Sequence, residues 1–186
     1  MRLHVPYFKQ NLSYICGLVA LQMIFAYFGI RKAREELIKE CKTSKKIGTT
    51  HKNLIDVLQK NGLYVHSHDD TILEEVENFV RSGVPVIVNY RELSEGEGHY
   101  AIITGFNWRY VFLNDPWYGA DYRIRKHVFV ANWYGYHESM DRRWILAVSD
   151  EPISNEDPKK IRRVLFKDWT RGRHWWHLFL RHRHLE

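Results

Sequence analysis

Residues 10–28 read QNLSYICGLVALQMIFAYF, and this stretch decides the fold. It is apolar almost throughout after Cys16, and Gly29 follows it, so we expect a helix over residues 14–28 that protein surrounds on nearly every face. Cys16 would then lie at the N-terminus of this helix, where unpaired N–H groups and the positive end of the helix dipole favour a thiolate. Gln10 could supply a side-chain donor to an oxyanion. On this segment alone, a nucleophilic Cys16 and a Cys16 that merely packs in the core are equally well supported.

The chain has the composition of a globular protein, with 186 residues of which 45% are hydrophobic and 15% aromatic. Its net charge of +6 is uneven, because residues 151–186 hold nine Lys or Arg and five Asp or Glu and so carry +4. The composition changes at residues 150–158, which indicates a linker. We therefore expect a domain over residues 1–150 and a basic, aromatic C-terminal extension over residues 151–186 that is helical in part.

The two cysteines, Cys16 and Cys41, are too few for a disulfide framework. One bridge between them would exclude Cys16 as a nucleophile, but no secretory signal is recognisable, so we expect both thiols to be reduced and the protein to be cytoplasmic. Residues 11–30 are free of charge yet contain Asn11 and Gln22, and a buried core helix therefore fits them better than a membrane span.

Hydrophobic periodicity and turn residues predict a helical first half and a strand-rich second half. Expected helices cover residues 14–28, 32–42 and 71–81, another ends at residue 60 after an N-cap within Gly48-Thr49-Thr50, and a helical patch covers residues 128–134. Thr71 with Glu74 is expected to form a capping box. Expected strands cover residues 63–68, 84–90, 99–106, 110–113, 122–125 and 144–149.

The position of His99 in the sequence predicts that this residue is the base for Cys16. It stands where the loop of residues 92–98 meets a strongly apolar strand, and site residues often lie at such junctions. A tight turn at residues 107–109 joins the next strand, which leads to Asp115, sixteen residues after His99. The hairpin would bring Asp115 beside His99, where it could fix the tautomer and stabilise the imidazolium. Each residue taken singly suits an ordinary strand end or turn, but their joint placement with Cys16 favours catalysis.

The remaining histidines are weaker candidates for a metal site. His66 and His68 alternate on a predicted strand and so share a face, although such a run is more often an exposed strand end. The extension contains further histidines without the cysteine or carboxylate partners of a zinc site: His174, His177, His182 and His184. We therefore expect neither a metal nor another cofactor.

The C-terminal extension combines an apolar stripe and the pair Trp175-Trp176 with many basic residues. Packing on the body or on another subunit is the favoured interpretation, and docking on a membrane surface or a protein partner is the alternative. Nucleic-acid binding is not expected, because no recognised module is present.

The order of these motifs resembles that of the C39 family of papain-like cysteine peptidases and its stand-alone C39-like relatives. The resemblance covers about residues 4–149. It rests on the segments VPYFKQ before Cys16-Gly17, AYFG, GTTHKNLIDVLQKNGL, SGVPVIVNY, GHYAIITGF, NDPWYG and WILAVSD, and on Phe129 and Trp133. Ile15 departs from the pattern, since the family often has an acidic residue just before the Cys.

The resemblance implies an α+β papain-like fold. Its N-terminal helical half would carry the catalytic Cys at a helix N-terminus, and its C-terminal half would be an antiparallel sheet. Carried over position by position, it makes Cys16 the nucleophile, His99 the general base and acid, Asp115 the orienting acid and Gln10 the oxyanion-hole amide. The implied reaction is cleavage of a peptide or amide bond through a thioester on Cys16.

The implied partner is a peptide or amide substrate, and a leader peptide is one candidate. Many family members are exporter domains that cleave leader peptides ending in two glycines, whereas we expect a stand-alone domain here. Two alternatives to hydrolysis stay open. One is a papain-like acyltransferase, in which an amine or thiol replaces water, and the other is a non-catalytic peptide-binding module, against which the presence of Cys16 argues.

Overall fold

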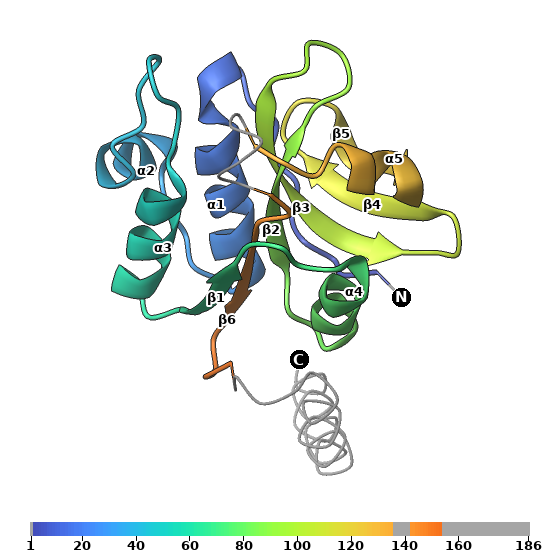
Figure 1. The fold of residues 1–186 in the computed structure, drawn as a ribbon. Coiled ribbons are helices and arrows are strands. Elements are labelled where there is room, and N and C mark those ends of the chain that lie inside the picture. Colours follow the sequence, from blue (N-terminus) through green and yellow to red (C-terminus); the bar gives the residue numbers. More distant parts are fainter. Residues whose placement is uncertain (1, 136–141, 154–186) are drawn as a thin grey trace, which may run out of the picture. The chain divides into compact units, whose positions relative to one another are not determined.

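A six-stranded antiparallel sheet organises the protein, whose computed structural model describes residues 2–135 and 142–153 (Figure 1). The order of the strands in the sheet is β1-β6-β2-β3-β4-β5. Their bounds are β1 Tyr64–His68, β2 Val86–Arg91, β3 Gly98–Phe106, β4 Tyr110–Asp115, β5 Gly119–Arg125 and β6 Ile145–Ser149. Strands β3 and β4 are neighbours, so the sheet places side by side the two strands of the hairpin on which the sequence predicts His99 and Asp115.

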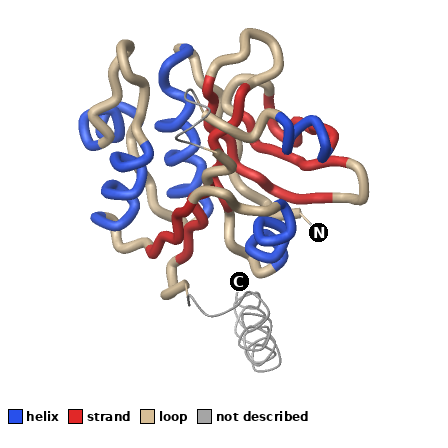
Figure 2. The backbone as a smooth tube through the Cα atoms, viewed as in Figure 1, coloured by secondary structure: helices blue, strands red, loops and turns tan. Residues whose placement is uncertain are grey.

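Helices cover both faces of this sheet, with α1, α2 and α3 on one side and α4 and α5 on the other (Figures 1 and 2). Their bounds are α1 Cys16–Tyr27, α2 Arg34–Glu40, α3 His51–Lys60, α4 Leu73–Arg81 and α5 Lys126–Ala131. A 3-10 turn, η1 Ser13–Ile15, leads directly into α1. The first helix therefore begins at Cys16, and the thiol lies at its N-terminus as expected.

Two apolar clusters, one on each face of the sheet, make up the core. Successive residues of β2 alternate between them, because strand side chains point to opposite faces: Ile87 joins the cluster with α1, while Val86 and Val88 join the cluster with α4. In α1, residues 16–21 and 23–25 are all buried. The predicted central helix, surrounded by protein, is therefore confirmed.

The cap predictions had mixed outcomes. Thr50 caps α3, since its side chain accepts a hydrogen bond from the Asn53 backbone N–H at 3.2 Å. The capping box of Thr71 with Glu74 is wrong by one position, because α4 begins at Leu73 and the Glu75 carboxylate accepts from the Ile72 N–H at 2.9 Å. The Thr71 hydroxyl is fully buried against His68 Nε2, at 3.2 Å, and this inward side chain leaves the cap position to the next residue.

Strand ends differ from the expected bounds where neighbouring strands extend them. Strand β4 continues to Asp115 instead of ending at residue 113, and β5 begins at Gly119 instead of residue 122, because the two strands pair as far as Asp115 and Gly119 across an irregularity. The tight turn before β4 is held by Asn107 Oδ1, which accepts from the N–H groups of Arg109 at 2.8 Å and Tyr110 at 2.6 Å.

The described residues belong to a unit that ends at Ile153. No helix within residues 2–135 and 142–153 is long and apolar enough to cross a membrane. The predicted extension, with its four histidines and its Trp pair, lies outside the described residues from residue 154 onward.

Candidate active site

The start of α1 is packed closely enough against the sheet to hold the Cys16 thiol in place. Cys16 is 8% exposed, and the following Gly17 is buried. A Cβ atom on Gly17 would lie 3.0 Å from the Tyr100 ring and 3.1 Å from the Thr49 Cβ, tighter than ordinary contacts. The lack of a side chain at Gly17 therefore favours the close approach of α1 to β3, the strand that carries His99.

The β3–β4 hairpin brings His99 and Asp115 together. His99 Nε2 lies 3.0 Å from Asp115 Oδ1, and both side chains are buried. The His99 side chain also interacts with the Cys16 thiol, through a side-chain hydrogen bond and through charge. Since Nε2 is engaged by Asp115, Nδ1 is the ring atom left to face the sulfur. Three residues that the sequence placed on separate elements thus form one chain of contacts.

Asp115 is held by more donors than His99 alone. Its Oδ1 also accepts from the backbone N–H groups of Trp117 at 2.8 Å and Tyr118 at 2.9 Å, and its Oδ2 accepts from the Tyr90 hydroxyl at 2.7 Å. Burial would raise the pKa of Asp115, but the bonds from His99, the Tyr118 N–H and Tyr90 lower it, so the carboxyl is an anion fixed in position.

Tyr90 is a site residue that the sequence did not reveal. It lies opposite His99 in the β2–β3 register and is fully buried. Burial and the charge of Asp115 both raise the pKa of its phenol, so it remains a hydrogen-bond donor. The only sequence signal was its position at the end of a strand next to the loop before His99.

The pKa of Cys16 is lowered although the thiol is buried. Burial alone would raise it, but the hydrogen bond and charge of His99, with the backbone N–H groups of Tyr100 and Gly17, favour the thiolate more strongly. The pKa of His99 is raised in turn: burial opposes this change, while the bonds to Asp115 and Cys16 outweigh it. The lowered pKa of Cys16 and the raised pKa of His99 both favour a thiolate–imidazolium pair, the nucleophilic form of a catalytic cysteine.

Gln10 lies beside this pair, with its donors engaged. Its backbone N–H bonds the carbonyl of Pro116 at 2.9 Å, which ties it to the turn after Asp115. The side-chain Nε2 donates to the carbonyls of Leu12 at 3.0 Å and Ser13 at 3.3 Å, while Oε1 is buried without a partner among the described residues. To donate to an oxyanion, the amide would have to release one of these carbonyls.

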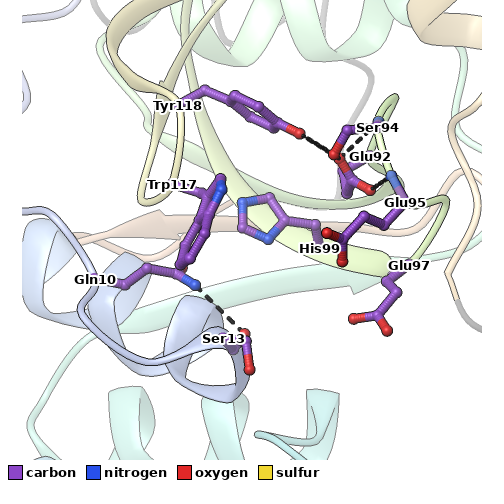
Figure 3. A pocket seen from close by; sticks show the side chains of 10 residues that line it. Gln10, Ser13, Glu92, Ser94, Glu95, Glu97, His99, Trp117 and Tyr118 are labelled. Carbon is purple, nitrogen blue, oxygen red and sulfur yellow. Dashed lines mark hydrogen bonds between the residues drawn. The ribbon is translucent and has the colours of Figure 1, made fainter.

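An open recess of about 470 Å³ adjoins His99 (Figure 3). Gln10 and Trp117 form one side of it in this view, and the loop of residues 92–98 forms the other. Its lining residues are Gln10, Ser13, Glu92, Ser94, Glu95, Glu97, Gly98, His99, Trp117 and Tyr118. The recess therefore opens the His99 side of the site to solvent.

The predicted metal candidates do not assemble into a ligand group in the part of the chain that the structure describes. No set of three or more His, Cys, Asp or Glu side chains there could hold a metal ion. The rings of His66 and His68 lie 4.9 Å apart on β1, and His68 Nε2 is engaged with Thr71.

A cysteine at a helix start that faces a histidine–carboxylate pair on an antiparallel sheet is the arrangement of the papain-like class of proteins. Residues 2–140 match the Peptidase_C39 like family, and the chain belongs to that family. No curated protein sequence matches the chain. The predicted resemblance to C39-like proteins is therefore confirmed.

Solved structures with the same fold include three peptidase-related proteins. The peptidase domain of Streptococcus ComA, a bifunctional ABC transporter of a quorum-sensing pathway, is 20% identical, with a TM-score of 0.65 and coverage of 81% of this chain and 100% of that one. A double glycine motif protease from an AMS/PCAT transporter, solved with the leader peptide, is 22% identical, with a TM-score of 0.61 and coverage of 79% and 92%. A C39-like protein from Bacillus anthracis is 16% identical, with a TM-score of 0.63 and coverage of 81% and 96%. These similarities confirm the α+β papain-like fold.

Proposed function

We propose that the protein is a cysteine peptidase or amide hydrolase that cleaves a peptide-type bond through a thioester on Cys16. The observation that carries this proposal is the continuous contact from the Cys16 thiol through His99 to Asp115, with pKa shifts that favour the thiolate–imidazolium pair. A buried cysteine with only a packing role would need none of these partners. The proposal therefore extends the family membership to an activity of this chain.

In the proposed first step, the Cys16 thiolate attacks the substrate carbonyl and forms a tetrahedral oxyanion. The Cys16 backbone N–H and a Gln10 amide that has left one of its carbonyl partners would stabilise this oxyanion. The His99 imidazolium then protonates the leaving amine as the C–N bond breaks, which leaves a thioester on Cys16.

In the second step, His99 takes a proton from water, which attacks the thioester and releases the acid and the Cys16 thiolate. Asp115 holds the imidazole through Nε2 during both steps and stabilises its cationic form, while the Tyr90 hydroxyl keeps the second carboxylate oxygen in place. Tyr90 acts through Asp115 and so is a positioning residue.

The proposed substrate is a peptide. A structural neighbour is a double glycine motif protease solved with the leader peptide, and this likeness supports an extended peptide as the first class to test. Leader peptides that end in two glycines are one candidate within that class. An acyltransferase would use the same thioester, and adding amines or thiols to the reaction would reveal it through new acyl products.

Alkylation by iodoacetamide at pH 6 tests the proposed nucleophile directly. We expect Cys16 to be alkylated much faster than Cys41, because the pKa of Cys16 is lowered while burial and then the charge of Glu40 raise the pKa of Cys41 to about 12. Peptide mass mapping would measure both rates in the same sample, so Cys41 is the internal control. Equally slow alkylation of both thiols would contradict the proposal and favour a peptide-binding module.

A further inference from the structure

A buried carboxylate, that of Glu92, is among the groups that line the recess beside His99. Glu92 is 8% exposed, and every group that bonds it is a neutral donor from the loop or from Tyr118. The Ser94 N–H lies at 2.9 Å, the Ser94 hydroxyl at 2.7 Å and the Gly96 N–H at 2.7 Å, and the Glu95 N–H and the Tyr118 hydroxyl complete the set. Burial would raise the pKa of Glu92, but these bonds lower it to about 2, so its negative charge is permanent near neutral pH.

Two more carboxylates extend this charge toward solvent. Glu95 and Glu97 are exposed, line the recess and form no ion pair with a Lys or Arg among residues 2–135 and 142–153. Figure 3 shows both side chains on the loop side of His99. Of the residues that line the recess, His99 alone can carry a positive charge. The lining of the recess therefore carries a net negative charge, while the Arg91 guanidinium, which donates to the Gly96 carbonyl at 2.9 Å, contacts the same loop and is not among the lining residues. A cleft lined by charges of one sign concentrates ligands of the other sign.

The opposite wall offers an acceptor and an aromatic ring. Gln10 is 4% exposed, and its Oε1 has no hydrogen-bond partner within the described part of the chain although it is buried at the recess. A buried acceptor without a partner is costly, so it indicates a donor on the ligand. Trp117 is 49% exposed and lies between Gln10 and His99 in Figure 3, where its ring could contact a cation. The Gln10 oxygen suits any hydrogen-bond donor and the Trp117 ring suits a cation, so an ammonium or guanidinium group satisfies both.

We propose that this recess binds a cationic side chain, Lys or Arg, on the leaving-group part of the substrate near the scissile bond. The leaving-group side is assigned because His99, which protonates the leaving amine, lines the recess, whereas Cys16, which accepts the acyl group, is not among the lining residues. This inference names the substrate class of the proposed peptidase and rests on that function.

Charged thiol reagents test the recess without any turnover. The Cys16 thiolate attacks the sulfenyl sulfur of a methanethiosulfonate, a mixed disulfide forms and methanesulfinate leaves. We expect the cationic 2-aminoethyl reagent to modify Cys16 about tenfold or more faster than the anionic 2-sulfonatoethyl reagent, after each rate is divided by its rate with 2-mercaptoethanol. The preference for the cationic reagent should shrink as the salt concentration rises, because the carboxylates of Glu95 and Glu97 are open to solvent.

A double variant and a matched control assign the preference to the recess. Glu95→Gln/Glu97→Gln should remove most of the rate ratio and leave the loop intact, because Glu92 keeps its partners. Glu74→Gln/Glu151→Gln removes the same net charge from exposed positions outside the recess and should leave the ratio unchanged. The cation-binding recess is wrong if the native protein shows no preference for the cationic reagent, or if the rate ratio falls equally in both variants.

Cleavage of a peptide mixture then tests whether the recess selects Lys or Arg in a substrate. A digest made with a Glu-specific protease supplies peptides that contain internal Lys and Arg. We expect Lys or Arg to be enriched just after the Cys16-dependent cleavage sites, and this enrichment to be lost in Glu95→Gln/Glu97→Gln. Cleavage sites with no excess of Lys or Arg on the leaving-group side would overturn the cation-binding recess.

The thiol-reagent experiment and the peptide-cleavage experiment together distinguish a failure of the cation-binding recess from a failure of the proposed peptidase activity. If the protein cleaves peptides without any charge preference, the cation-binding recess is wrong and the proposed peptidase activity is supported. If the protein cleaves nothing, yet prefers the cationic reagent through Glu95 and Glu97, the cation-binding recess is supported and the proposed peptidase activity is wrong.

Discussion

Cys16 and Cys41 are both free, both buried and both placed at the end of a helix, yet their pKa values move in opposite directions. Cys16 is the first residue of α1, and Cys41 is the C-cap of α2. Burial raises the pKa of either thiol, so burial cannot distinguish them. The difference lies in what else approaches the sulfur.

The surroundings of Cys16 stabilise negative charge, and those of Cys41 do not. Cys16 meets the His99 ring and two backbone N–H groups, whereas Cys41 has the carboxylate of Glu40 as its charged neighbour. The backbone of Cys41 is engaged, with its N–H bonded to Leu37 and its carbonyl to Asn53 Nδ2 at 2.7 Å. The direction of the pKa shift of a helix-end thiol is therefore set by its partners across the fold.

Removing each sulfur in turn gives the largest expected contrast. Cys16→Ala should lower peptide turnover by about 10⁶-fold, because no other group can form the thioester. Cys41→Ala should leave turnover within a few-fold of the native value, since Cys41 lies outside the contacts of the site. Turnover is measured as release of peptide products, and circular dichroism shows that both variants are folded. Full activity in Cys16→Ala would contradict the mechanism.

Asp115→Asn should make the reactivity of the Cys16 thiol more like that of Cys41. The amide cannot stabilise the imidazolium as a carboxylate does, so turnover should fall by about 10⁴-fold. The sign of the pH effect follows from the same coupling. A less stable imidazolium supports the thiolate less, so the pKa of Cys16 rises and its alkylation at pH 6 slows toward the rate of Cys41. The native pair should stay reactive from the lowered pKa of Cys16 up to the raised pKa of His99.

The exposed Asp56→Asn on α3 is the matched control for that substitution. It makes the same chemical change on the surface and should alter neither turnover nor alkylation. If Asp115→Asn left the alkylation profile of Cys16 unchanged, His99 would not depend on the carboxylate, and the proposed chain of contacts would be wrong.

The sequence predicted the parts of the site that depend on periodicity and short turns. The apolar run after Cys16 requires a buried helix, and the turn at Asn107 makes it possible to pair the strands that carry His99 and Asp115. Tyr90 could not be predicted, because its bond to Asp115 depends on the register of β2 against β3. That register is set by packing between distant segments, which leaves no local pattern in the chain.

Two other features escaped prediction for a related reason. The bonds of the Gln10 amide to Leu12 and Ser13 follow from the 3-10 turn before α1, and no residue pattern announced that turn. Glu92 read as part of a polar loop, whereas the structure buries its carboxylate and surrounds it with donors from the loop and from Tyr118. Side-chain orientation within loops depends on the assembled fold, and for this reason the acidic recess was found only in the structure.

Gln10→Ala should separate the reactivity of Cys16 from its catalysis, with the smallest effect of these changes. Turnover should fall by about 10²–10³-fold, the typical cost of one oxyanion donor. Alkylation by iodoacetamide should keep its native rate, because displacement at a saturated carbon forms no oxyanion for Gln10 to stabilise. The exposed Gln59→Ala on α3 is the control and should change neither rate. If both rates fell together in Gln10→Ala, the amide would act by positioning the thiol, and the oxyanion role would be wrong.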